Sequence, residues 1–227
     1  MGSARDLTLA FDTAGAHCAG AMLSGDRIVA ERFLSMARGQ AEALMPMLED
    51  LLAGAGAGWD AVSLIAVGVG PGNFTGTRVS VAAARGLALA LRVPARGVSA
   101  FETMRDPAGL SDHPQELVSI EAPRGAAYVQ RFAHGQATGA PLLVDPAAPG
   151  DIGIAVRRVR GYRAGEIARA LGAEASEAAA VDIAPRLARI ARWRLARGED
   201  PARPAPLYVR PADAAPMRDV PPTILPG

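Results

Sequence analysis

The residues best suited to chemistry form a glycine-rich segment, residues 68–78, which reads Gly-Val-Gly-Pro-Gly-Asn-Phe-Thr-Gly-Thr-Arg. The apolar run before it predicts a buried strand, and the small and aliphatic residues after it predict a helix over 76–91. Such a strand-to-helix turn can bind an anion with its bare backbone amides, or it can let the helix lie close to a sheet. Both interpretations stay open, and the candidate nucleotide- or phosphate-binding residues are Asp12, Thr13, Gly70, Gly72, Thr75, Gly76 and Arg78.

The first turn of the predicted helix carries polar side chains with alternative roles. Arg78 could bind a phosphate or carboxylate bidentately, and it could equally pair with Asp12 or cap a neighbouring carbonyl. Thr75 or Thr77 is the predicted N-cap, because its hydroxyl would accept a hydrogen bond from an orphan amide.

The glycine spacing excludes two common nucleotide-binding loops. A Walker loop needs four residues between its glycines and then Lys with Ser or Thr, whereas Thr77 and Arg78 follow Gly76 here. All 24 basic residues are Arg, so the chain has no Lys for P-loop or Schiff-base chemistry. The Gly-x-Gly-x-x-Gly dinucleotide fingerprint is also missing from this turn.

The sequence offers few residues with the spacing of a catalytic or metal site. Asp12 ends the first predicted strand, where ribonuclease H-like nucleases bind a divalent metal, but the strand ending at residue 69 leads into glycines rather than a second carboxylate. A turn-forming role for Asp12 is as well supported. The three histidines include no pair with i, i+4 spacing, and no Gly-x-Ser-x-Gly elbow occurs. We therefore predict no catalytic residue and no metal site.

The pattern of apolar runs and turn residues predicts an α/β chain. The first half predicts strands 7–11, 16–23 and 27–34, helix 39–53, strand 62–69, helix 76–91 and strand 93–98. This order is typical of ribonuclease H-like and actin-like folds. The second half predicts a hairpin of strands 117–121 and 126–133, short strands 141–145 and 152–156, helices 164–171 and 175–197, and a Pro-rich tail from residue 201.

Several segments resemble signatures of the TsaB (YeaZ) family, bacterial partners in making threonylcarbamoyladenosine in tRNA. Residues 70–78 resemble Gly-Pro-Gly-Ser-Phe-Thr-Gly-x-Arg, residues 9–13 resemble Leu-Ala-Ile-Asp-Thr, residues 121–128 resemble Asp-Ala-Arg-Arg-Gly-Glu-Val-Tyr, and residues 206–210 resemble Pro-Leu-Tyr-x-Arg. Gln40 and Glu121 depart from the family pattern, in which many members have His and Asp.

The resemblance implies an actin-like (ASKHA, ribonuclease H-like) duplicated α/β fold in two lobes, the second of them degenerate. We expect the first lobe over residues 1–102, the smaller second lobe over 103–210, and a mobile tail over 211–227.

The resemblance also implies a non-catalytic scaffold or activator subunit. It would bind the catalytic homologue TsaD, with TsaE as a further partner, for threonylcarbamoyl transfer to the adenosine next to the anticodon of tRNAs that read A-starting codons. The interface implied by the family uses helices 39–53 and 76–91, with the candidates Leu44, Met47, Leu48, Leu51, Val79, Ala82, Ala83 and Gly86. We expect the same patch to form a homodimer without TsaD. No cofactor would be intrinsic; ATP or ADP would bind at the complex interface, and tRNA only through the complex.

Two other classes of function stay open. The retained glycines favour a stand-alone actin-like nucleotide-binding ATPase or phosphotransferase, which the missing Lys, metal carboxylates and His pair oppose. A net charge of +1 opposes a tRNA-binding module. The local basic cluster at 157–163 is either a solvated edge or a phosphate contact.

The cysteine content and the lengths of the apolar stretches bear on where in the cell the protein is found. Cys18 is the single cysteine, which excludes an intrachain disulfide and fits a small core residue. No signal peptide is recognisable, and no apolar stretch reaches the ~20 residues of a membrane span. We therefore expect a cytoplasmic protein that makes no membrane contact.

Overall fold

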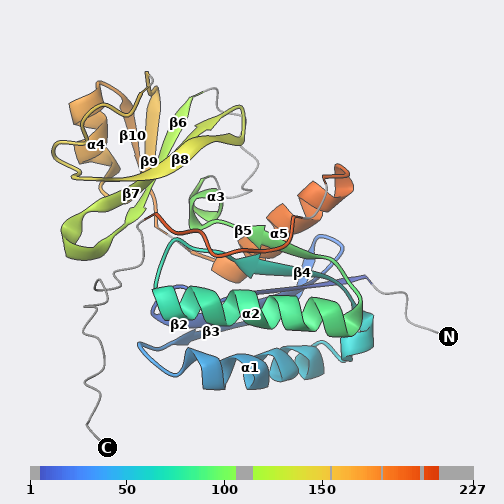
Figure 1. The fold of residues 1–227 in the computed structure, drawn as a ribbon. Helices are drawn as coiled ribbons and strands as arrows, with labels where there is room; N and C mark the ends of the chain where they lie inside the picture. The colour runs from blue at the N-terminus through green and yellow to red at the C-terminus, as the bar shows by residue number, and fades with distance from the viewer. Residues whose placement is uncertain (1–5, 106–114, 154, 180, 200–201, 210–227) are drawn as a thin grey trace, which may run out of the picture.

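The computed structural model describes residues 6–105, 115–153, 155–179, 181–199 and 202–209 as two lobes, each built on a five-stranded sheet (Figure 1). The first sheet has the order β3-β2-β1-β4-β5, from β1 (Leu7–Asp12), β2 (His17–Ser24), β3 (Arg27–Ser35), β4 (Val62–Gly68) and β5 (Ala95–Val98). An antiparallel meander forms β1 to β3, whereas β4 runs parallel to β1 and β5 parallel to β4. The helices α1 (Gln40–Gly54) and α2 (Phe74–Leu91) precede and follow β4, with the short η1 (Trp59–Ala61) before it.

The second sheet repeats this plan. Its order is β8-β7-β6-β9-β10, from β6 (Glu116–Glu121), β7 (Ala127–Ala133), β8 (Gln136–Val144), β9 (Arg158–Gly161) and β10 (Glu174–Glu177), with η2 (Pro123–Gly125) in the first hairpin. The same meander is followed by parallel strands, and α4 (Ala164–Leu171) joins β9 to β10 as α2 joins β4 to β5. The described residues between β8 and β9 contain no counterpart of α1. The structure thus confirms the predicted actin-like fold with a second lobe that has lost an element.

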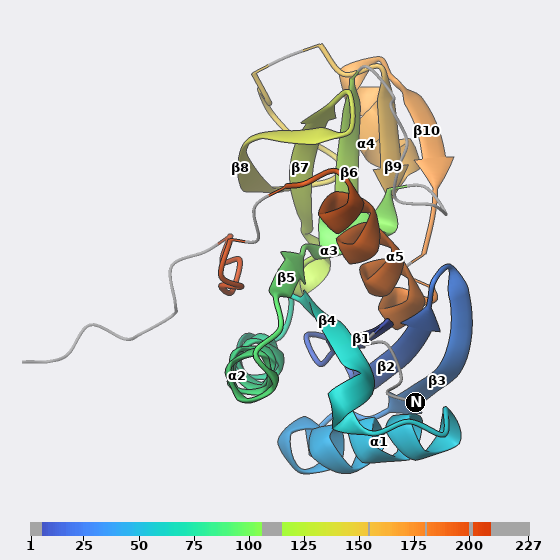
Figure 2. The ribbon, with the colours of Figure 1, turned by 90° about the vertical axis from the view of Figure 1, so that its right-hand side faces the viewer.

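The last helix of each half packs on the opposite lobe. α3 (Ala100–Met104) follows β5, but its Phe101 and Met104 pack against the second sheet. α5 (Ile183–Ala196) follows β10 and packs with Leu187 and Ile190 on the first sheet (Figure 2). A single boundary after residue 102 therefore does not separate the two lobes, because α5 follows the second sheet in sequence but packs on the first.

The strand β1 shows how the first sheet separates two apolar layers. Leu9 and Phe11 belong to the layer with α1 and α2, whereas Ala10 belongs to the layer with α5. The alanines Ala21 and Ala66 lie in the same α5 layer. Their small side chains let α5 lie close to the sheet.

The structure corrects the predicted elements in the second half. The segment over 174–177 is the strand β10 rather than the start of a helix, because pairing with β9 overrides its alanine-rich helix propensity. The described residues of 152–156 form no strand. Pro185 lies in the first turn of α5, where a missing N–H is tolerated. The predicted tail, 211–227, lies outside the described residues.

A buried ion cluster lies at the start of β6. The fully buried Glu116 accepts hydrogen bonds from Arg105 Nε at 3.2 Å and from Arg158 Nη2 at 2.7 Å. Arg160 and Arg163 also bond groups of the same chain. Three arginines of the predicted basic cluster therefore bond groups of the same chain, although the side chains of Arg158 and Arg163 stay partly exposed to solvent. Among the described residues, no helix has both the length and the hydropathy of a membrane span.

Candidate functional site

The glycines of segment 68–78 let the β4–α2 turn pack directly on the β1–β2 turn. A Cβ built on Gly72 or on Gly76 would overlap a backbone carbonyl oxygen of the β1–β2 turn. Gly70 has a φ of +83°, a conformation that side chains disfavour. These glycines are required by the packing of this chain alone, which favours the tight-turn interpretation over a phosphate loop.

The amides that begin α2 are already hydrogen-bonded. Asn73 Oδ1 accepts from Thr75 N at 3.0 Å and from Gly76 N at 3.2 Å. Thr13 Oγ1 donates to the carbonyl of Gly76 at 2.7 Å. The predicted threonine caps were wrong, because the helix begins at residue 74 and the Asn73 side chain reaches two amides. Thr77 Oγ1 instead donates to the Asn73 carbonyl at 2.9 Å.

Arg78 faces the C-terminal segment rather than the glycine turn. Its Nε donates to the hydroxyl of Tyr208 at 2.8 Å, and its guanidinium carbon lies 3.5 Å from the ring centroid of Phe74. This aromatic sandwich is exposed and lies away from Asp12, which has another partner. The predicted phosphate-binding residues are therefore not gathered around one point.

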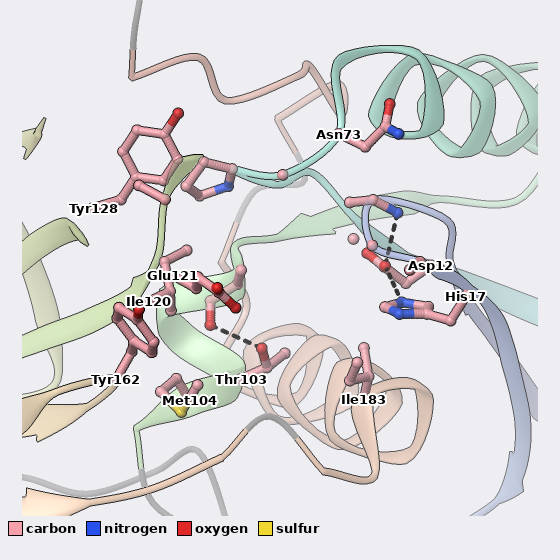
Figure 3. Close-up of a pocket in the computed structure, with 18 of the residues that line it drawn as sticks. Asp12, His17, Asn73, Thr103, Met104, Ile120, Glu121, Tyr128, Tyr162 and Ile183 are labelled. Carbon is pink, nitrogen blue, oxygen red and sulfur yellow. Dashed lines mark hydrogen bonds and ion pairs between the residues drawn. The ribbon is translucent and has the colours of Figure 1, made fainter. Parts of the chain in front are cut away.

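A cleft of about 740 Å³ lies between the two lobes (Figure 3). On its first-lobe wall, the Asp12 carboxylate lies 2.7 Å from His17 Nε2 and accepts the backbone N–H of Ala14 at 2.9 Å. Gly68 lies beneath Asp12, where a Cβ would overlap the carboxylate. Of the predicted phosphate-binding residues, only Asp12 and Gly72 line this cleft.

The second-lobe wall combines a carboxylate with two aromatic side chains (Figure 3). Glu121 ends β6, Tyr128 lies on β7, and Tyr162 directly follows β9. Met104 and Ile120 add apolar surface. Sequence reasoning missed Tyr162, because the strand that positions it was interpreted as part of a basic cluster.

The chemical capacity of this site is modest. Within the described residues, no group of three or more His, Cys, Asp or Glu side chains could hold a metal ion. Cys18 is buried, and this burial, with the nearby charge of Asp12 as a second cause, raises the pKa of its thiol to about 11. The thiol is therefore protonated at neutral pH and is a poor nucleophile. The Asp12–His17 pair can orient a ligand or hold a proton in the cleft.

Comparisons with known proteins agree with this architecture. The family model for TsaD, tRNA N6-adenosine threonylcarbamoyltransferase, matches residues 27–180. The tRNA threonylcarbamoyladenosine biosynthesis protein TsaB of Escherichia coli is 33% identical over 142 residues, which are 59% of this chain and 61% of that protein. The uncharacterized protein Mb3455c of Mycobacterium bovis is 34% identical over 211 residues, 92% of this chain and 94% of its own length. The solved structure of YeaZ from Pseudomonas aeruginosa superposes with a TM-score of 0.71 at 28% identity, covering 89% of this chain and 99% of that one.

The chain belongs to the TsaB (YeaZ) family. Its match spans only about three fifths of the E. coli TsaB, 61% of that protein. The similarity over nearly the whole length comes from the M. bovis protein and from the solved YeaZ structure.

The predicted docking stripe on α1 faces the interior of this TsaB family member. Leu44, Met47, Leu48 and Leu51 are all buried in the apolar layer beneath the first sheet. The prediction that these side chains offer a docking surface was wrong, because the apolar face of an amphipathic helix covers its own sheet.

The outward face of the same two helices is different. On α2, Ala82 and Gly86 are exposed, whereas Val79 and Ala83 are half-buried. Met45 on α1 is 38% exposed. In Figure 1 the two helices lie side by side along the first sheet, away from the second lobe. The four predicted residues of α2 therefore lie at or near a surface that a partner could reach.

Proposed function

We propose that this chain is a non-catalytic subunit in the biosynthesis of threonylcarbamoyladenosine in tRNA, and that it supports the catalytic homologue TsaD by binding it. The proposal extends to this chain the function that the names of its TsaB relatives state. TsaE would be a further component, and tRNA would bind only through the complex.

Gly86 is the observation that carries the docking proposal. A glycine inside a helix costs about 1 kcal/mol relative to alanine. A Cβ at Gly86 would meet no atom within 4 Å, so no contact among the described residues requires glycine there. A partner helix that packs closely on α2 would require it, because interhelical distance depends on the side chains at the contact.

The surroundings of Gly86 support a helical docking face. Ala82 lies one turn before it and is exposed. Leu89 on the same helix is 82% exposed, and Met45 contributes an apolar side chain from α1. A small centre bordered by larger apolar side chains suits a second pair of helices, and the desolvated middle of an interface is typically apolar.

The glycine turn supports the non-catalytic part of the proposal. Asn73 occupies amides that a phosphate would need, and the turn glycines are used for packing. ATP or ADP would therefore act at the interface with TsaD rather than in this turn.

The test is co-elution of the purified chain with TsaD by size-exclusion chromatography. Gly86→Met should abolish the complex without unfolding the chain, because the new side chain points into open space. Ala196→Met is the matched control, an exposed alanine at the end of α5 on the other face of the sheet, and it should bind normally. Threonylcarbamoylation of tRNA by TsaD and TsaE should be lost with Gly86→Met alone. Normal binding by this variant would remove α2 from the interface.

A homodimer in the absence of TsaD is part of the same proposal. Light scattering over a concentration series should give a dimer that Gly86→Met converts to a monomer and that TsaD displaces. ATP hydrolysis by the isolated chain, lost in Asp12→Asn, would instead favour a stand-alone ATPase.

A further inference from the structure

The lining of the interlobe cleft is unusual in its charge. The chain contains 24 arginines, yet none is among the described residues that line the cleft. Its charged groups are the carboxylates of Asp12 and Glu121 on opposite walls, with His17 beside Asp12. Arg163, which follows the lining residue Tyr162, is paired with Glu166. A phosphate placed here would meet negative charge from both lobes.

The second-lobe wall contributes a carboxylate and two aromatic rings to the cleft (Figure 3). Tyr128 pairs with Ile120 across the β6–β7 ladder, and Tyr162 N donates to Ser119 O at 3.0 Å, so both tyrosines lie at the end of β6 that carries Glu121. Both rings are partly buried. Aromatic faces attract ammonium groups through their quadrupole, and an adjacent carboxylate adds a direct ion pair.

The rest of the cleft is suited to an apolar body. Val98, Met104, Ile183 and Leu187 line it from elements of both lobes. The volume, about 740 Å³, lies within the ~300–1,000 Å³ usual for small-molecule sites. A ligand of this size would touch both walls at once.

We propose that the interlobe cleft binds an organic ammonium ion with an apolar or aromatic body, and not a nucleotide. The ammonium group lies between Glu121 and the faces of Tyr128 and Tyr162, and the body packs along Met104 and Ile183. This inference is independent of docking to TsaD, because no residue of α1 or α2 is among those that line the cleft.

The test uses the full chain and four probes of known charge. These are 2-phenylethylammonium, its neutral isostere 2-phenylethanol, the anion phenylacetate, and MgATP. Isothermal titration calorimetry should give a dissociation constant roughly fivefold to tenfold lower for the ammonium than for the alcohol. In protein-observed NMR, the ammonium should change the chemical shifts of the cleft residues. Phenylacetate and MgATP should not perturb those residues.

Two variants and a matched control identify the groups responsible. Glu121→Gln should remove the advantage of the ammonium over the alcohol, and it should stay folded because Glu121 is exposed. Tyr162→Leu should weaken the ammonium more than the alcohol, since it removes a ring face and keeps an apolar side chain. Glu174→Gln, an exposed acid of the same lobe outside the cleft, should change neither affinity. Equal affinity for ammonium and alcohol, no detectable binding of the ammonium, unchanged discrimination in Glu121→Gln, or MgATP binding in the cleft would each overturn the proposal.

Discussion

Replacing glycine with alanine at two positions of α2 should change stability in opposite directions. At Gly86 the new Cβ enters open space, so only the helix propensity changes. That change stabilises the chain by about 1 kcal/mol. For a protein of this size the melting temperature should rise by roughly 2–4 °C.

At Gly76 the same substitution meets the β1–β2 turn. The Cβ would overlap the carbonyl oxygen of Thr13 and lie 3.0 Å from its carbonyl carbon. Relieving the overlap moves two backbone segments that are tied by the Thr13 Oγ1–Gly76 O hydrogen bond of 2.7 Å. Overpacking costs about 1–3 kcal/mol and the weakened hydrogen bond about 1 kcal/mol, against a helix gain of at most ~1 kcal/mol. The net destabilisation of ~1–3 kcal/mol should lower the melting temperature by roughly 2–12 °C.

Calorimetry measures the melting temperature of both variants, and urea titration measures their free energy of unfolding. The double variant should show additive effects, since ten residues of helix separate the sites by about 15 Å. A rise in melting temperature for Gly76→Ala would refute the close contact of the two turns. A fall for Gly86→Ala would mean that its outward position is wrong.

Three further predictions concern buried groups. Glu116→Gln should destabilise the chain by about 3–5 kcal/mol, because it leaves the buried Arg105 guanidinium without its carboxylate; a urea midpoint unchanged from the parent would contradict the buried cluster. Met47→Glu should unfold the chain, whereas Met45→Glu should leave it folded, since Met47 is 3% and Met45 is 38% exposed; far-ultraviolet circular dichroism distinguishes them, and two folded variants would disprove the buried stripe. Cys18 should react with iodoacetamide at pH 8 at least tenfold more slowly in the native chain than in urea, because its thiol pKa is raised to about 11 and it is fully buried; equal rates would show that the site is open.

The sequence predicted the first lobe well because its signals are local. The apolar run before Gly68 and the small residues after Gly76 place β4 and α2 to within two residues of their observed bounds. The second lobe was less predictable. β9 consists of Arg-Val-Arg-Gly and β10 of Glu-Ala-Ser-Glu, and neither has the apolar run of a buried strand. β9 forms by parallel pairing with β6, and β10 forms by parallel pairing with β9. Such long-range contacts leave little trace in a short window of sequence.

The candidate site was predicted only in part for the same reason. Asp12 was recognised from its place at the end of a strand, but its partner His17 was dismissed because no helical spacing connects the histidines. The β1–β2 turn brings the two side chains together across five residues. Glu121 and Tyr162 come to the same wall of the cleft only when the β6 and β9 strands pair, so this placement depends on the tertiary fold. The prediction of a docking stripe on α1 was wrong for a different reason. Apolar periodicity on a helix identifies the face that is buried, and it does not identify what covers that face.

The connections between the lobes bear on which kind of function the fold serves. The helices that cross between lobes, α3 and α5, are tied to each other by the Arg194–Glu102 ion pair and by the buried Arg186, whose Nη1 donates to Thr103 O at 2.8 Å. Glu102 also closes the capping box of α3 with Ser99. The hinge of an actin-like enzyme must open and close around its nucleotide, and charge-assisted links that are buried or partly buried oppose such movement. These links favour a fixed angle between the lobes. A subunit that only offers a rigid helical face does not require the lobes to move. Its preformed surface loses less conformational entropy when it docks.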